Sequence, residues 1–167
     1  MPSSTLGGSV KSRLIASLAV GAAVVLGTTG CTFITPQSST ITYAAAEGIN
    51  VYEMGVLEVR NAFIVANDEG DLGNLVAAVI NTSDEMQTLN LSIGEGDSID
   101  LSIRVPAGET LSFGTDDLEP IELDGIEMVP GTDVPAQFST DGAESHITVL
   151  PVLDGRLDYL TALVPRD

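Results

Sequence analysis

Apolar and polar residues alternate along much of the second half of this 167-residue chain. Two neighbouring segments, 89–93 and 99–105, carry Leu, Ile or Val at every second position, with Asn, Ser, Asp or Arg between them. A period of two is typical of a strand that buries one face in a sheet. The segment between the two, 94–98, has the sequence GEGDS, which predicts a hairpin loop.

Two earlier segments, 57–65 and 72–81, are more continuously apolar, which predicts central strands covered on both faces. Segments 134–138 and 146–152 supply later strands, and clusters of Gly, Asp, Asn and Ser separate all of them. About eight short antiparallel strands at this spacing predict an all-β fold, a single antiparallel β-sandwich. With no Trp and no pair of cysteines, a true immunoglobulin domain with its inter-sheet disulfide is not indicated.

The first thirty residues follow a different pattern. Lys11 and Arg13 precede an uncharged apolar run, 14–27, and small residues lead from there to Cys31. This is the layout of an export signal. At about 1.5 Å per residue the run reaches about 21 Å, short of the roughly 30 Å hydrocarbon core of a membrane. We therefore expect residues 1–30 to be a cleaved signal peptide.

Cys31, the only cysteine, directly follows the small-residue site. The site resembles a bacterial lipobox with Gly30 before the modified cysteine, although Thr28 and Thr29 replace the commonest residues. The resemblance implies a diacylglyceryl group on the Cys31 thiol and acyl chains such as palmitate. Two chains anchor a protein stably, here on the exterior face of the cell membrane. The alternative is an incidental residue of an ordinary signal peptide or an unpaired thiol in a tail.

Residues 31–46 are rich in Ser and Thr and lack an apolar period, which predicts a flexible tether. The tether joins the lipidated cysteine to a β-sandwich domain at 47–167. Tyr43, in the tether, and Tyr52, in the first strand region, are the aromatic side chains that we expect to remain free. The sequence therefore predicts that these two tyrosines contact a partner.

Charge narrows the choice of partner. Lys11 and Arg13 are two of six basic residues, so after cleavage four arginines face all 24 acidic residues and the side-chain net charge is −20. Such a surface repels phosphate backbones, which excludes nucleic-acid binding, and it also repels anionic lipid headgroups. The charge either keeps an exported domain soluble or docks a basic partner by electrostatic complementarity.

Candidate chemistry is sparse. His146 is the only histidine, and alternation favours a solvated strand position for it. No GxSxG motif occurs, so a hydrolase triad is not indicated. Residues 67–74 resemble the start of a calcium loop, but Ala78 stands where the bidentate Glu is needed. We therefore expect no catalytic residue, no small-molecule substrate and no cofactor apart from the lipid on Cys31.

Several longer segments together resemble the actinobacterial LpqE-like lipoproteins across most of the mature chain: GINVYEMGVLEVRNAFIVAN, VAAVINTSDEMQTL, IRVPAGETLSFG, PIELDGIEMVPGTDVPAQFS and VLPV. More distantly, the chain resembles the PCu(A)C copper-chaperone fold, a cupredoxin-like β-sandwich. The first resemblance implies a non-catalytic accessory subunit that docks on a membrane complex, the respiratory cytochrome bcc-aa3 supercomplex.

The second resemblance implies an alternative function, copper delivery. PCu(A)C domains bind Cu(I) through His and Met, which are soft ligands suited to that ion. Pro120, Ile121 and Glu122 stand at the place of the expected His-x-Met pair, and no Met precedes the PAG turn. We therefore expect the scaffold without its metal site. A copper carrier would need atypical ligands brought together by folding: Met128, Met86 and His146. A third possibility is an apolar pocket that carries a lipid.

Overall fold

The chain was analysed as a computed structural model, which describes residues 13–21 and 46–166. It divides into two units, Met1–Tyr43 and Ala44–Asp167. In the first unit residues 13–21 form a short helix, in which the Ser17 hydroxyl donates a hydrogen bond to the Arg13 carbonyl at 3.0 Å. Among the described residues, no helix has the length and apolarity needed to cross a membrane.

The second unit holds all the strands of the described residues, and a 3-10 helix near its end. They are β1 (Ile49–Met54), β2 (Leu57–Ala66), β3 (Leu72–Asn81), β4 (Gln87–Ile93), β5 (Ile99–Val105), β6 (Thr110–Phe113), β7 (Ile121–Asp124), β8 (Asp133–Thr140), β9 (His146–Leu153) and η2 (Thr161–Leu163). Four alternating or apolar segments of the sequence, 57–65, 72–81, 89–93 and 99–105, therefore do form strands.

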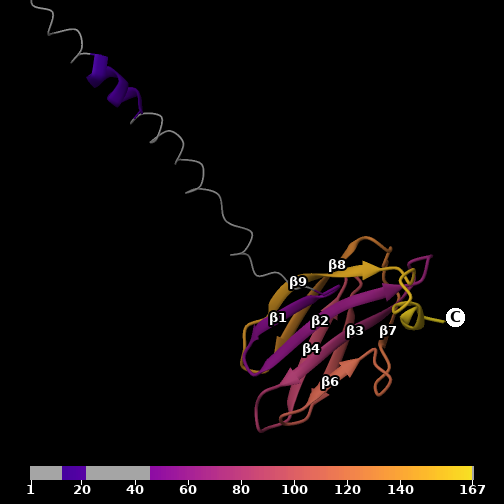
Figure 1. Cartoon of the computed structure of the whole chain (residues 1–167). Coiled ribbons are helices and arrows are strands. Elements are labelled where there is room, and N and C mark those ends of the chain that lie inside the picture. The colour runs from indigo at the N-terminus through magenta and orange to yellow at the C-terminus, as the bar shows by residue number, and fades with distance from the viewer. Residues whose placement is uncertain (1–12, 22–45, 167) are drawn as a thin grey trace, which may run out of the picture. The chain divides into compact units, whose positions relative to one another are not determined.

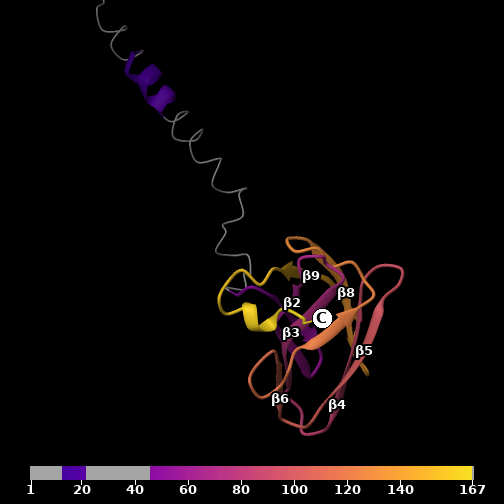
Figure 2. The same cartoon turned by 90° about the vertical axis from the view of Figure 1, so that its right-hand side faces the viewer.

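These strands build two sheets packed face to face (Figure 1). In the β2–β3 sheet, β1 pairs with β2, and β6 and β7 both pair with β3. In the β4–β8 sheet the order is β5, β4, β8, β9. Figure 2 separates the layers, with β2, β3 and β6 on one side and β4, β5 and β8 on the other. The predicted all-β sandwich is confirmed.

The two sheets are joined along one side of the sandwich. β9 pairs with β8 in the antiparallel sense, but its last residues, Val152 and Leu153, pair in parallel with Ile64 and Val65 of β2. The strands therefore form one continuous path from β5 to β6, and the sandwich is nearly closed. β5, at the other end of this path, pairs only with β4 among the described strands.

The principal core lies between the sheets and consists of the inward side chains of both. Leu89, Leu91 and Ile93, which the alternation places on one face, are all buried there. Phe138 of β8 and Leu150 of β9 contribute from the neighbouring strands. Burying each side chain of this size contributes about 1.5–3 kcal/mol to folding, so inward alternation is the main source of stability.

A bulge in β2 explains why its sequence is continuously apolar. The register of β2 against β3 shifts between Arg60 and Phe63, and Asn61 has a φ of 49°. The Asn61 side-chain oxygen accepts a hydrogen bond from the Gly48 amide at 2.8 Å, which holds the bulge. A bulge adds one residue, so the residues after it point to the opposite face. Phe63 and Val65 consequently lie on the outer face of the β2–β3 sheet.

Residues 157–165, which we name the C-terminal strap, cover this outer face. Leu160 of the strap is buried against Phe63 and Val65, and Leu163 and Val164 pack beside it. Figure 1 shows the C-terminal end of the chain beside the ends of β2 and β7. The expectation of two covered faces therefore holds for the second half of β2. Towards the end of β3 every second residue is only half-buried, so the outer face of that strand is not fully covered.

Two polar contacts hold the strap. The Asn74 side-chain amide, on β3, donates a hydrogen bond to the Leu163 carbonyl at 2.9 Å. The Tyr159 hydroxyl donates one to the Glu47 carboxylate at 2.6 Å. Because Glu47 lies just before β1, this second bond joins the start of the described domain to its end.

Candidate functional site

Two of the predicted site residues, Cys31 and Tyr43, lie outside the described residues. Lipidation of Cys31 and a contact made by Tyr43 therefore remain predictions. Tyr52, the other tyrosine predicted to contact a partner, lies on β1 and is exposed.

Tyr52 is engaged within the chain. The guanidinium carbon of Arg60 lies 4.4 Å from the centre of its ring, which is cation–π distance. Arg60 in turn donates a hydrogen bond of 2.6 Å to Glu58, and this bond raises the pKa of Arg60 above its ordinary value. Tyr52 thus presents an aromatic ring to solvent with an arginine already over it.

The three residues of the atypical copper set lie apart. Met128 is fully buried in the principal core, where a Cβ atom added to Gly73 would lie 2.6 Å from its sulfur. Its amide donates to the Gly70 carbonyl at 2.7 Å, which fixes it before the start of β8. His146 pairs with Phe138, towards the end of β8.

Extended chain separates these positions. Phe138 is five residues further along β8 than Asp133, at the start of the strand, which corresponds to about 17 Å. Met86 precedes β4 at the same end of the β4–β8 sheet as His146, because Leu89 pairs with Thr140. Folding therefore brings Met86 and His146 to one end of the sheet and Met128 to the other. Among the described residues, no group of three or more His, Cys, Asp or Glu is arranged to hold a metal ion.

The positions that replace the expected His-x-Met pair adjoin the strap. Ile121 and Glu122 begin β7 and pair with Leu75 and Asn74 of β3. Pro120 and Glu122 line an open hollow of 790 Å³, to which the strap also contributes. This lining contains carboxylates and the Arg166 guanidinium but neither imidazole nor thioether, so it lacks the soft ligands that Cu(I) prefers.

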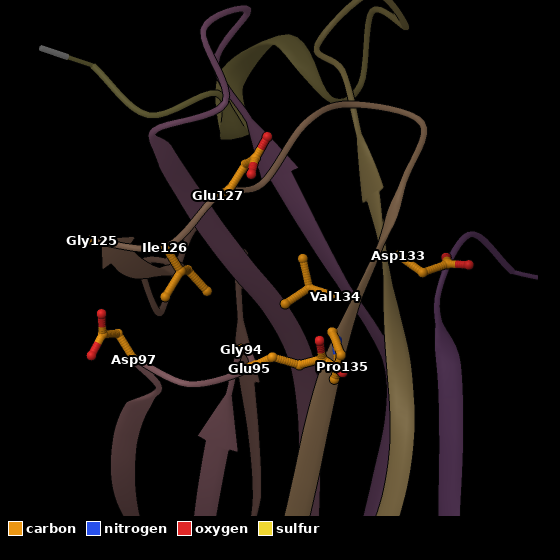
Figure 3. A pocket seen from close by; sticks show the side chains of 9 residues that line it. All are labelled: Gly94, Glu95, Asp97, Gly125, Ile126, Glu127, Asp133, Val134 and Pro135. Atoms are coloured by element: carbon orange, nitrogen blue, oxygen red, sulfur yellow. The ribbon is translucent and has the colours of Figure 1, made fainter.

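A second hollow, of 380 Å³, lies at one end of the β4–β8 sheet, between the β4–β5 loop, the β7–β8 loop and the start of β8. Glu95, Asp97, Glu127 and Asp133 contribute carboxylates to its lining, and Ile126 contributes an apolar side chain. Figure 3 shows Asp97, Glu127 and Asp133 on different sides, with their carboxylates pointing apart. The arrangement makes this end of the molecule electronegative without converging on one ligand position.

The outer face of β9 carries exposed apolar side chains. Ile147 is 73% exposed and Val149 44%, while Leu150 and Val152 of the same strand are buried in the core. Val149 pairs with Pro135 of β8. We name the group formed by Pro135, Ile147, Val149 and Pro151 the β9 strip.

Alternation in the sequence predicts the two faces of β9 but not which of them is solvated. His146, expected in solvent, is half-buried on the face that continues to the buried Leu150, whereas Ile147 lies on the exposed face. Counting back from Leu150 in steps of two gives this result, because residues two apart in a strand share a face. That count is the signal by which the β9 strip could have been predicted.

Comparisons with known proteins were made on the whole chain. No protein-family model matches it, and no curated protein matches it. Among solved structures, the chain is similar to a copper-bound PCuAC domain from PmoF2, with 16% identity and a TM-score of 0.47 over 62% of this chain and 97% of that one. It is also similar to the apo PmoF2 PCuAC domain, with 17% identity and a TM-score of 0.48 over 62% and 94%.

No comparison offers support for a respiratory subunit. At this identity and TM-score, copper binding does not transfer from the two PCuAC domains to this chain either.

Proposed function

We propose that the chain is a non-catalytic binding module, held on the exterior face of a cell membrane by lipid on Cys31, that docks on a protein partner. The observation that carries the proposal is the charge of the mature chain, in which 24 carboxylates accompany four arginines. Two of these arginines, Arg60 and Arg156, are engaged by Glu58 and Asp154 at 2.6 and 3.2 Å. Among the side chains that the structure describes no other ion pair forms, so most of these carboxylates lack a counter-charge.

A basic protein surface is the partner that fits this charge. Like charges on one compact domain repel each other, and a partner rich in Lys and Arg relieves the repulsion while steering the encounter. An anionic lipid surface would add to the repulsion. Charge at an interface acts mainly on the association rate and its salt dependence, whereas desolvated apolar contacts set most of the affinity.

The finer proposal is that the partner is a membrane protein complex. The resemblance to LpqE-like lipoproteins supports an accessory subunit of the respiratory cytochrome bcc-aa3 supercomplex. The tether, at 31–46, gives the domain about 20 Å of reach from its anchor, which suits contact with the exterior part of such a complex.

Fractionation and copurification test this proposal. Full-length protein with a C-terminal tag is solubilised from membranes in mild detergent, and the proteins that accompany it are identified at low and high salt. If the chain is a binding module, a membrane protein should copurify with it in a stoichiometric amount. Less of that protein should be retained at high salt. A Cys31→Ala variant should remain folded but leave the membrane fraction or keep its signal peptide. A wild-type protein that copurifies with no protein at either salt concentration would contradict the proposal.

Copper delivery is the second candidate, and the two solved structures reported above are PCuAC domains. It would use His146 and Met86, which share one end of the β4–β8 sheet, with Met128 remaining apart in the core. Titration of the mature domain with Cu(I) against a competing chelator separates the candidates. A one-to-one complex that disappears in a His146→Ala variant would favour copper delivery, and absence of a stoichiometric site would favour the binding module.

A further inference from the structure

The β9 strip is an exposed apolar surface on an otherwise polar sheet face. Ile147 is the most exposed large apolar side chain of residues 46–166, and Val149 lies two residues further along the same face. On β4 and β5 the corresponding outer positions are polar: Asn90, Ser92, Asp100 and Ser102. The apolar character is therefore confined to β8 and β9.

Folding does not require these apolar side chains. Leu150 and Val152 give β9 its packing against the core, and an exposed strand position accepts Thr, a β-branched polar residue, as readily as Ile or Val. Exposed apolar patches on a soluble domain lower its solubility and commonly mark contact sites. The outward Ile147 and Val149 are thus explained by a contact outside the described domain.

Carboxylates stand at both ends of the strip. At one end, exposed Asp133 pairs with Pro151, and exposed Glu127 lies in the loop before β8. At the other end, Asp141 and Glu144 are exposed in the loop between β8 and β9. A second copy of this chain would bring these carboxylates against like charges, and anionic lipid would do the same. Lysine or arginine would complement them.

From this arrangement we infer that the β9 strip is the docking surface of the module and accepts an apolar segment of a partner protein flanked by Lys or Arg. The inference rests on the proposed function, since it names the surface and the partner chemistry of that docking. Ile147 and Val149 supply the desolvated centre of the contact, and the four carboxylates supply its charged rim.

Photo-crosslinking in native membranes tests the surface directly. A photoreactive amino acid replaces Ile147 in one full-length protein and Leu157 in a matched one, because Leu157 is also exposed, at 52%, but belongs to the strap. The expected result is a crosslink from position 147 to one identified peptide that contains apolar residues and at least one Lys or Arg. Position 157 should give none to that protein.

Substitution provides the second measurement. Ile147→Thr with Val149→Thr keeps β-branched side chains and adds no charge, and Leu157→Thr is the control. The double variant should retain the thermal unfolding temperature of the wild type and lose about tenfold or more of the copurifying partner, as loss of a central apolar contact does. The control should lose none.

The outcomes separate the inference from the proposed function. Crosslinks from position 147 to lipid, to a second copy of this chain or to an acidic peptide would overturn the inference, as would unchanged copurification of the double variant. In each of these cases a wild type that still copurifies with a membrane protein leaves the proposed function standing. A wild type that copurifies with no protein, together with no crosslink to any protein from either substituted position, overturns both.

Discussion

The two outer faces of this sandwich both carry apolar side chains, but only one of them is covered by the chain itself. On the β2–β3 sheet, Phe63 and Val65 lie beneath Leu160 of the C-terminal strap and are buried. On the β4–β8 sheet, Ile147 and Val149 lie on β9 with no described segment over them. The difference separates an apolar face that packs within the fold from one that, as we propose, serves an intermolecular contact.

The largest expected effect comes from the covered face. Phe63→Ala removes a ring that is buried between β2 and the strap, and should lower the free energy of unfolding by about 3–5 kcal/mol. Ile147→Thr, on the uncovered face, should change it by no more than about 0.5 kcal/mol. Urea denaturation of the two mature domains measures both values. Equal losses would show that the β9 strip also serves folding and would remove the distinction.

The bulge that turns Phe63 outward gives the next effect. Asn61→Ala replaces a residue that tolerates the left-handed φ of 49° with one that tolerates it less, and removes the acceptor of the Gly48 amide, so the free energy of unfolding should fall by about 2 kcal/mol. Asn61→Gly tolerates the same φ and should lose less, because only the hydrogen bond is missing. If the two variants lose the same free energy of unfolding, the positive φ at Asn61 does not contribute to the loss.

A smaller loss is expected from the polar contact beneath the strap. Asn74→Ala removes the donor to the Leu163 carbonyl and should cost about 1 kcal/mol. Hydrogen exchange should become faster in residues 157–165 but stay unchanged in β9. Faster exchange throughout the domain would indicate that the strap does not open separately from the sandwich.

The bond between Tyr159 and Glu47 is exposed and gives the smallest effect. The Tyr159 hydroxyl lowers the pKa of Glu47, and the same bond raises the pKa of Tyr159. A lowered carboxyl pKa stabilises the fold above the usual Glu pKa, and this contribution is lost as the pH falls through the lowered value. The raised Tyr159 pKa stabilises it below the usual Tyr pKa, and that contribution is lost as the pH rises through the raised value.

NMR titration of the Glu47 carboxyl carbon checks this bond. In Tyr159→Phe the pKa of Glu47 should move up towards its ordinary value, because the largest cause of its lowering is removed. A Glu47 pKa that is equal in the two proteins would mean that the bond does not persist in solution.

Most of the fold can be predicted from the sequence, because the core is built from strands in which apolar and polar residues alternate. Segments 89–93 and 99–105 predict β4 and β5, and the hairpin at 94–98 follows from its Gly and Asp residues. The bulge at Asn61 escaped prediction because it depends on the Gly48 amide, thirteen residues away. The strap escaped it because Leu160, Leu163 and Val164 have helical spacing over only one turn, too short to be told from a loop.

The candidate site was harder to predict than the fold. Net charge is a property of composition and leaves two interpretations open, solubility or a basic partner. The surface that would meet such a partner depends on which face of β9 is solvated. Alternation alone does not decide this, and the burial of Leu150 does. Grouping His146, Met86 and Met128 also required knowledge of strand direction, since β8 separates Met128 from the other two.

Hydroxyl-radical footprinting of the full-length protein tests the contrast between the two faces most directly. Labelling of Ile147 and Val149 is compared between the isolated mature domain and the protein in native membranes, with exposed Leu157 as internal reference. Our account predicts that labelling of the β9 strip falls severalfold in membranes, while labelling of Leu157 and of buried Leu160 stays the same. Unchanged labelling of Ile147 and Val149, with a loss at Leu157, would contradict it.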